Sequence, residues 1–149
     1  MALDCYINIS DIPGEAKVTG YEDWIKADSF TIGVSSSGGH TTELHDLSFV
    51  HPIDKASAKL VDACCNDTDL SEVEVDLVEE STMYMKYVFS PGSKGAGADA
   101  HVLRVTSVSP SGASGEGDRP REHVSIRYGK LKVTYSDGNI EGEYDASLS

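Results

Sequence analysis

Histidine is the residue type in this sequence best suited to hold a metal ion or to move protons near neutral pH. His40, His45 and His51 are five and six residues apart, a spacing that matches no usual zinc-ligand pattern. His101 and His123 stand alone in the sequence. We therefore predict histidines that lie at the surface or are satisfied by hydrogen bonds, and we predict no metal site.

Carboxylates and glycine-rich runs are the other groups whose chemistry depends on spacing. Asp67, Asp69, Glu72 and Glu74 lack the ligand order and the central glycine of a calcium-binding EF-hand loop. The glycine-rich run at 111–117 follows a predicted strand but opens no helix, so it lacks the context of a phosphate-binding loop. No GxSxG, P-loop or GxGxxG pattern occurs. The sequence indicates no catalytic residue and no cofactor, and we expect a protein that is not an enzyme.

Charge is divided unequally along the chain. Residues 1–80 hold 17 acidic and 4 basic residues, whereas residues 81–149 hold 8 of each, so the first part accounts for the whole net charge of −13. So large an acidic excess repels phosphates and argues against a nucleic-acid partner. Two interpretations remain open: a solvated acidic surface that aids solubility, or an acidic face that meets a basic stretch of another copy.

That basic stretch lies in residues 115–135, which also carry a clear strand pattern. Its bases are five of the chain's twelve, namely Arg119, Arg121, Arg127, Lys130 and Lys132. Val124 and Ile126 alternate with polar residues, and beyond Gly129 the alternation resumes on the other phase from Leu131. A change of phase at a glycine is typical of a bulge or tight bend. We predict two strands of a curving sheet or barrel.

Alternating apolar and polar residues predict further strands in the rest of the chain. These strands cover residues 3–9, 24–34, 45–51, 73–77, 83–89, 103–107 and 140–144. The last returns antiparallel to 131–135 after a turn at Asp137-Gly138. Polar or glycine-rich segments at 35–43 and 91–98 are predicted loops.

One convincing helix is predicted over residues 54–65. Asp54 or Ser57 can cap it, and Asn66 and Asp67 end it. Its apolar residues recur at helical spacing, at Ala56, Leu60, Ala63 and Cys64. About nine strands and one helix indicate a mainly β, antiparallel barrel or sandwich with the helix across a sheet or at a barrel end.

Length and composition favour a single domain over residues 1–149. No run approaches the roughly 20 apolar residues of a membrane span. The first ten residues lack the pattern of a signal peptide, so we expect folding in the cytoplasm. Three cysteines, Cys5, Cys64 and Cys65, are an odd set that favours small buried hydrophobic residues over a disulfide framework.

From the residues alone, two functions stay open. Trp24 and the seven tyrosines are suited to line the cavity of a monomeric or dimeric barrel that binds a small ligand. A structural barrel that assembles with copies of itself is equally compatible.

Four blocks of the sequence, in order, resemble the hemolysin-coregulated protein (Hcp) family, the inner-tube subunits of the bacterial type VI secretion system. The blocks are ALDCYINISDIPGEAK (2–17), HDLSFVHPIDKASAKLVDACC (45–65), LRVTSVSPSGASGEGDRPREHVSIRYGKLKVTY (103–135) and DGNIEGEYDAS (137–147). Three departures concern the loops: Gly117 stands where the family more often has Glu, the segment 91–98 is longer than expected, and the segment 35–43 is shorter than in some relatives.

The resemblance implies an antiparallel β-barrel with one flanking α-helix that assembles as a hexameric ring. Rings would stack into a hollow tube that is built in the bacterial cytoplasm and propelled out of the cell. The implied partners are further copies, a spike protein, a contractile sheath and baseplate, and effector proteins in the lumen, with no nucleic acid and no membrane insertion. A tail-tube subunit of another phage-like contractile machine is a related alternative.

Two segments are the implied subunit contacts. The first is the loop that in the family reaches neighbouring subunits, here Ser37, Gly38, Gly39, His40, Thr41 and Thr42. The second is the charged elbow, here Asp118, Arg119, Arg121 and Glu122. An acidic region 1–80 and a basic stretch near the elbow offer opposite charges for head-to-tail contacts.

Overall fold

The structure is a computed structural model that describes residues 3–38, 41–80, 82–91, 103–112, 119–135 and 140–145. Its elements are β1 (Leu3–Ile9), β2 (Ile25–Ala27), β3 (Ser29–Gly38), β4 (Thr41–Pro52), α1 (Ala56–Cys65), β5 (Val73–Glu79), β6 (Thr82–Ser90), β7 (Arg104–Ser111), β8 (Arg121–Arg127), β9 (Lys130–Tyr135) and β10 (Glu141–Asp145). The predicted loop at 91–98 beyond Pro91 and the predicted turn at Asp137-Gly138 lie outside the described residues.

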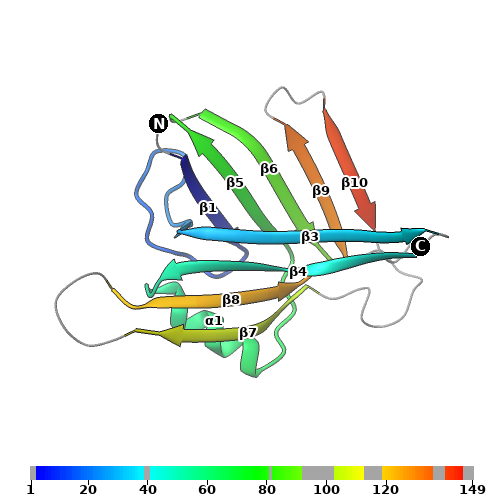
Figure 1. Cartoon of the computed structure of the whole chain (residues 1–149). Coiled ribbons are helices and arrows are strands. Elements are labelled where there is room, and N and C mark those ends of the chain that lie inside the picture. The colour runs from blue at the N-terminus through cyan, green and yellow to red at the C-terminus, as the bar shows by residue number, and fades with distance from the viewer. Residues whose placement is uncertain are drawn as a thin grey trace.

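The strands form two antiparallel sheets. A six-stranded sheet has the order β10-β9-β6-β5-β1-β2, and a four-stranded sheet has the order β3-β4-β8-β7. The strands of the two sheets cross at a steep angle, with α1 beside β7 (Figure 1). This crossing is the orthogonal kind of sheet packing. Within the described residues no strand ladder joins the two sheets, so the barrel is held closed by side-chain packing. The predicted mainly β fold with one flanking helix is confirmed.

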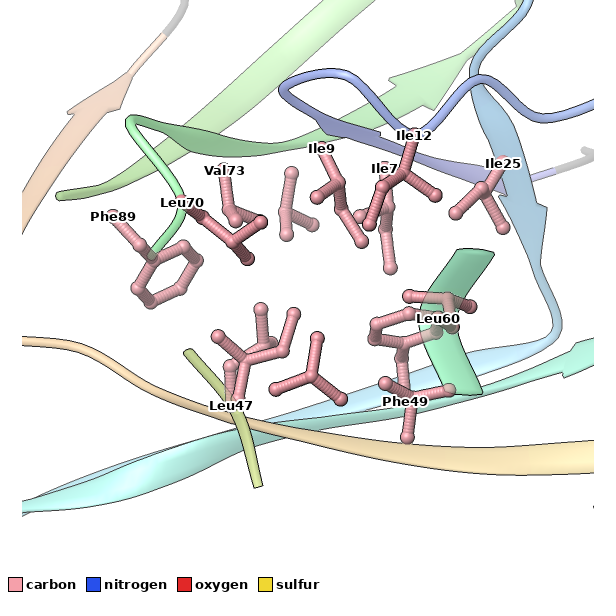
Figure 2. Packing of buried hydrophobic residues seen from close by; sticks show 14 of the residues in the cluster. Ile7, Ile9, Ile12, Ile25, Leu47, Phe49, Leu60, Leu70, Val73 and Phe89 are labelled. Atoms are coloured by element: carbon pink, nitrogen blue, oxygen red, sulfur yellow. The ribbon is translucent and has the colours of Figure 1, made fainter. Parts of the chain in front are cut away.

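The core lies between the two sheets. Figure 2 shows Ile7, Ile9, Val73 and Phe89 from the six-stranded sheet facing Leu47 and Phe49 from the four-stranded sheet, with Leu60 of the helix beside Phe49. Each of these side chains is almost completely buried, and burying one contributes about 1.5–3 kcal/mol. The alternation of apolar and polar residues in the sequence therefore correctly predicted which side of these strands faces the core.

The helix ends at the predicted Cys65 but begins at Ala56, two residues later than predicted. The Asp54 carboxylate accepts a hydrogen bond from the Ala56 N–H (2.9 Å), and Ser57 Oγ accepts one from the Asp54 N–H (3.2 Å). At the other end the Asn66 N–H donates to the Asp62 carbonyl (3.0 Å), and Asp67 has a positive φ of 51° that breaks the helix. The N-cap position itself is occupied by Lys55, whose side chain makes no capping bond, and the two predicted capping residues instead hold the turn that starts the helix.

The single strand predicted over residues 24–34 is wrong. The chain changes sheets at Asp28, so β2 belongs to the six-stranded sheet and β3 to the four-stranded sheet. The Asp28 N–H donates to the Val50 carbonyl (2.7 Å) at this corner. The inward-facing apolar residues change phase at this corner, from Ile25 and Ala27 to Phe30 and Ile32, so the sequence does carry a sign of the break.

The predicted bend at Gly129 is confirmed, and its cause is a second change of sheet. β8 lies in the four-stranded sheet and β9 in the six-stranded sheet. The Gly129 N–H donates to the Ser90 carbonyl (3.1 Å). The change of phase in the sequence marks the point where the chain turns from one sheet to the other.

The polar loop predicted at 35–43 is also wrong, because β3 and β4 continue as a hairpin. Ser35 pairs with Glu43 and Ser36 with Thr42, and a register shift follows before the Gly38–Thr41 pair. Strand signals are lost here because this part of the hairpin lies beyond the core, where no apolar face is required. The split of 24–34 accounts for ten strands in the described residues instead of about nine.

Candidate functional site

The charged elbow sits at the corner where β8 begins. Arg121 is the register partner of Pro52, the last residue of β4. Its guanidinium lies 2.5 Å from the Asp28 carboxylate and donates to the Arg119 carbonyl (2.6 Å). Arg119 in turn donates to the Ile53 carbonyl (3.3 Å) and lies 3.6 Å from the Glu15 carboxylate. The two arginines therefore bind three segments of the acidic first part of the chain.

These contacts show that opposite charges meet inside one protomer. The Arg119 side chain is 63% exposed and keeps much of its surface for a further contact. Exposed ion pairs contribute only about 0–1 kcal/mol each, so their main effect is to position the two guanidinium groups at the corner.

Glu122 lies in the interior of the protomer, unlike the two arginines. Its carboxylate is 2% exposed and lies 2.8 Å from Nε2 of His51, which is fully buried. The other imidazole nitrogen, Nδ1, has no hydrogen-bond partner among the described residues and lies 3.8 Å from the Asp54 carboxylate. Glu122 accordingly offers no surface contact in the isolated chain, and it supports the elbow from beneath.

Asp54 completes this buried cluster. Burial raises the pKa of the Asp54 carboxyl, and the Glu15 and Glu122 carboxylates add to the rise, whereas the Ala56 N–H and His51 oppose it. No pattern in the sequence indicated that His51 is the buried partner of Glu122. It is the register partner of Glu122, and a pairing between residues 71 positions apart leaves no local signal.

The hairpin residues named as contacts lie at the opposite end of β4. The backbones of Ser37, Gly38, Thr41 and Thr42 are in β3 and β4, while Gly39, His40 and Asp118 lie outside the described residues. Because β4 runs from Thr41 to Pro52, about 3.3 Å per residue puts roughly 36 Å between its two ends. The structure does not bring the two sets together.

Of the aromatic residues considered for a ligand cavity, Tyr128 is part of the packed core, whereas Tyr6, Tyr21 and Trp24 lie outside the barrel interior. Tyr6 stacks on Tyr21 with 4.6 Å between ring centroids, and Trp24 meets Tyr21 edge-on at 4.9 Å. The Tyr21 hydroxyl donates to Asp76 (2.9 Å), and burial followed by this bond raises the pKa of Tyr21. Tyr6 alternates with the core residues Cys5 and Ile7 along β1, so this stack covers the outer face of the six-stranded sheet.

Neither a metal-binding cluster nor a membrane-spanning helix occurs in the residues described above. No group of three or more His, Cys, Asp or Glu among them has the arrangement of a metal site. Within the same residues, no helix combines the length and apolarity required to cross a bilayer.

The fold and the charged elbow define a class of protein, namely a small antiparallel β-barrel of two crossed sheets with one flanking helix. Comparison with known proteins identifies the family within that class. The sequence matches the family described as "Type VI secretion system effector, Hcp" over residues 6–135. The chain belongs to the Hcp family of the type VI secretion system.

Individual relatives agree along the full chain. Protein hcp1 of Pseudomonas aeruginosa is 26% identical over 97% of this chain and 90% of its own length. The crystal structure of Hcp1 from Salmonella typhimurium is 25% identical, has a TM-score of 0.84 and covers 100% of this chain and 98% of its own. A type VI secretion system effector from Yersinia pestis has the same fold, with a TM-score of 0.78 at 24% identity over 95% of this chain and 99% of its own. The resemblance found in the sequence is confirmed.

Proposed function

We propose that this chain is the repeating subunit of a type VI secretion tube, in which six copies form a ring and rings stack into a hollow tube. The observation that carries this function is membership of the Hcp family over residues 6–135, together with a barrel that superimposes on an Hcp1 structure over its whole length. A tube needs rigidity and complementary surfaces, and it needs no active site.

The contacts between copies are head-to-tail. A ring that closes by rotation joins two different surfaces of each copy, and the two ends of β4 are such surfaces. The hairpin residues 37–42 of one copy contact the elbow of the next, where Arg119 and Arg121 are positioned at the corner. Glu122 supports that corner through His51 and makes no direct contact.

The rest of the proposal concerns partners and location. The 149 residues act as one barrel domain without a catalytic role, and the tube carries a spike at its tip inside a sheath and baseplate. Tubes assemble in the bacterial cytoplasm, enclose effector proteins and leave the cell through the contractile machine. Neither nucleic acid nor membrane lipid is a partner, which fits the net charge of −13.

Native mass spectrometry and negative-stain microscopy of the purified chain test the ring. We expect a species of six times the 15.9 kDa protomer mass and ring-shaped particles. A strictly monomeric protein over a wide concentration range would overturn the proposal. Neighbouring genes for sheath, spike and membrane-complex proteins, in place of phage head and tail genes, distinguish this tube from a phage tail tube.

A further inference from the structure

His51 places each of its two ring nitrogens next to a carboxylate. Nε2 lies 2.8 Å from Oε1 of Glu122 on β8, and Nδ1 lies 3.8 Å from Oδ1 of Asp54, in the turn that starts α1. The side chain of His51 is 0% exposed, that of Glu122 2% and that of Asp54 10%. Three ionisable groups thus meet where water screens their charges very little.

A neutral imidazole cannot suit both carboxylates. It carries one N–H, so one ring nitrogen donates a hydrogen bond and the other presents a lone pair. With the proton on Nε2, the lone pair of Nδ1 faces Asp54, and with the proton on Nδ1, the lone pair of Nε2 faces Glu122 across 2.8 Å. In both tautomers two acceptor atoms face each other, unless the cluster holds one further proton on the imidazole or on a carboxyl group.

Asp54 is not free to turn away from this contact. Its Oδ1 atom, which lies 3.8 Å from Nδ1 of His51, also accepts the Ala56 N–H (2.9 Å) at the start of α1. Nδ1 has no hydrogen-bond partner among the described residues. A proton between Nδ1 and Asp54 therefore supplies the missing interaction and leaves the start of the helix in place.

The charges around the cluster favour the further proton. On the other side of the helix turn, the Glu15 carboxylate accepts the Lys55 N–H (2.6 Å). Burial, together with the nearby Glu15 and Glu122 carboxylates, raises the pKa of the Asp54 carboxyl. The cations around the cluster are each paired with an exposed acid, in the pairs Lys55–Asp23, Arg119–Glu15 and Arg121–Asp28. A proton held inside the cluster is then what balances its two buried carboxylates.

We propose that His51, Asp54 and Glu122 form a proton-dependent clasp, which holds one proton more than a neutral imidazole and two carboxylates would hold. This inference does not depend on the proposed ring. His51 and Glu122 are fixed by the ladder between β4 and β8, whereas Asp54 belongs to the turn before α1. Loss of the proton makes the Asp54 carboxylate and the imidazole lone pair repel each other, which releases that turn.

The clasp makes the charged elbow sensitive to pH. The carbonyl of Ile53, next to Asp54, accepts a hydrogen bond from Arg119 (3.3 Å), and the Ile53 N–H donates to the Pro120 carbonyl (2.9 Å). Release of the turn therefore moves the backbone that holds Arg119 at the corner.

The number of bound protons gives the sign of the pH dependence. Above about pH 6.5, a free imidazole and a free carboxyl group have both lost their protons, so the unfolded chain holds one proton fewer than the clasp. The stabilisation is therefore complete below about pH 6.5. Above it, the unfolding constant rises up to tenfold per pH unit until the clasp loses its proton.

Asp54→Asn tests the clasp, because the amide oxygen still accepts the Ala56 N–H but places no negative charge next to Nδ1. Asp11→Asn is the matched control, since it removes one exposed acid at a positive φ of 65°, which asparagine also adopts. Urea unfolding at pH 6 and pH 8.5 compares the three proteins at a concentration where all have the same oligomeric state. We expect the unfolding constants of the wild type and the control to rise about tenfold more than that of Asp54→Asn. An equal rise in all three would overturn the proposal, whether or not rings form.

Nuclear magnetic resonance of the wild-type chain locates the proton directly. At pH 7.5 the nitrogen shifts of the His51 ring and the carbon shifts of the Asp54 and Glu122 carboxyl groups should show an imidazolium or one protonated carboxyl group. A neutral imidazole between two ionised carboxylates would overturn the proposal.

Hydrogen exchange of residues 53–60 measures the release of the turn. Protection factors should fall between pH 6 and pH 8.5 in the wild type and stay level in Asp54→Asn. The same fall in both proteins would contradict a release that depends on the clasp.

Discussion

The imidazole of His51 and the carboxylate of Glu122 face each other across β4 and β8, with 2.8 Å between Nε2 and Oε1 and almost no exposure to solvent. They fix the register of the two central strands of the four-stranded sheet directly beneath the charged elbow. A polar pair in this position is satisfied only when β4 and β8 align as they do.

Removing one member of this pair should be costly. Glu122→Ala leaves a buried imidazole without its partner, and we expect the free energy of unfolding to fall by about 3–5 kcal/mol. His123→Ala, one residue further along β8 and exposed, is the control and should change it by less than about 0.5 kcal/mol. Urea unfolding measures both, and equal effects in the two variants would contradict a role for the buried pair.

Reversing the charge of the elbow should weaken assembly more than folding. Arg119→Glu with Arg121→Glu loses exposed ion pairs to Glu15 and Asp28, each worth about 0–1 kcal/mol. It also adds acids at a corner that, in the proposed ring, faces another copy of a chain with a net charge of −13. Sedimentation should show fewer rings, most clearly at low salt, where charges are least screened. Lys17→Glu with Lys59→Glu makes the same change of charge at two exposed residues. Unchanged salt dependence of assembly in the elbow variant would show that charge complementarity is not involved.

Stability should fall at alkaline pH because buried acids of the folded chain hold their protons. Burial, aided by the Asp76 carboxylate, raises the pKa of the Cys5 thiol from 9.0 to about 12. The unfolded chain releases this proton above pH 9 and the folded chain does not, so the stabilisation is complete below pH 9 and is lost as the pH rises towards 12. Urea unfolding at pH 8 and pH 10.5 should give a smaller drop for Cys5→Ala than for the wild type. Equal drops in the free energy of unfolding for the two proteins would exclude Cys5 as a source of the alkaline loss of stability.

Tyr128 should tolerate loss of its hydroxyl. The side chain is 5% exposed, and its ring lies against the ring of Phe89 with 4.7 Å between the ring centroids. Its hydroxyl has no hydrogen-bond partner among the described residues. An unsatisfied buried hydroxyl costs about 1–3 kcal/mol, so Tyr128→Phe should raise the free energy of unfolding by about 1 kcal/mol. Tyr135→Phe, at an exposed ring, serves as the control with little change. A loss of stability in Tyr128→Phe would mean that the hydroxyl is bonded after all.

Local patterns in the sequence determined which side of each strand faces inward. Cys5, Ile7 and Ile9 are buried as their alternation predicts, because side chains of one strand alternate between its two faces whatever the neighbouring strand is. The ends of the helix also depend on local contacts, because the hydrogen bonds there join residues only two to four positions apart. The four sequence blocks that resemble the Hcp family predicted the fold as well, and the match to that family and to an Hcp1 structure confirms this prediction.

Only the tertiary structure decided which strands share a sheet and how far each sheet is covered. Asp28 and Gly129 are both corners between sheets, and the phase of apolar alternation shifts at each, but the shift does not say which strand the chain pairs with next. His51 and Glu122 are 71 residues apart and become partners through register alone. Tyr135 and Ile140 have the pattern of core residues, but burial requires an opposing layer, and the crossed four-stranded sheet does not reach them. Apolar alternation specifies a face, and the arrangement of distant segments specifies what covers it.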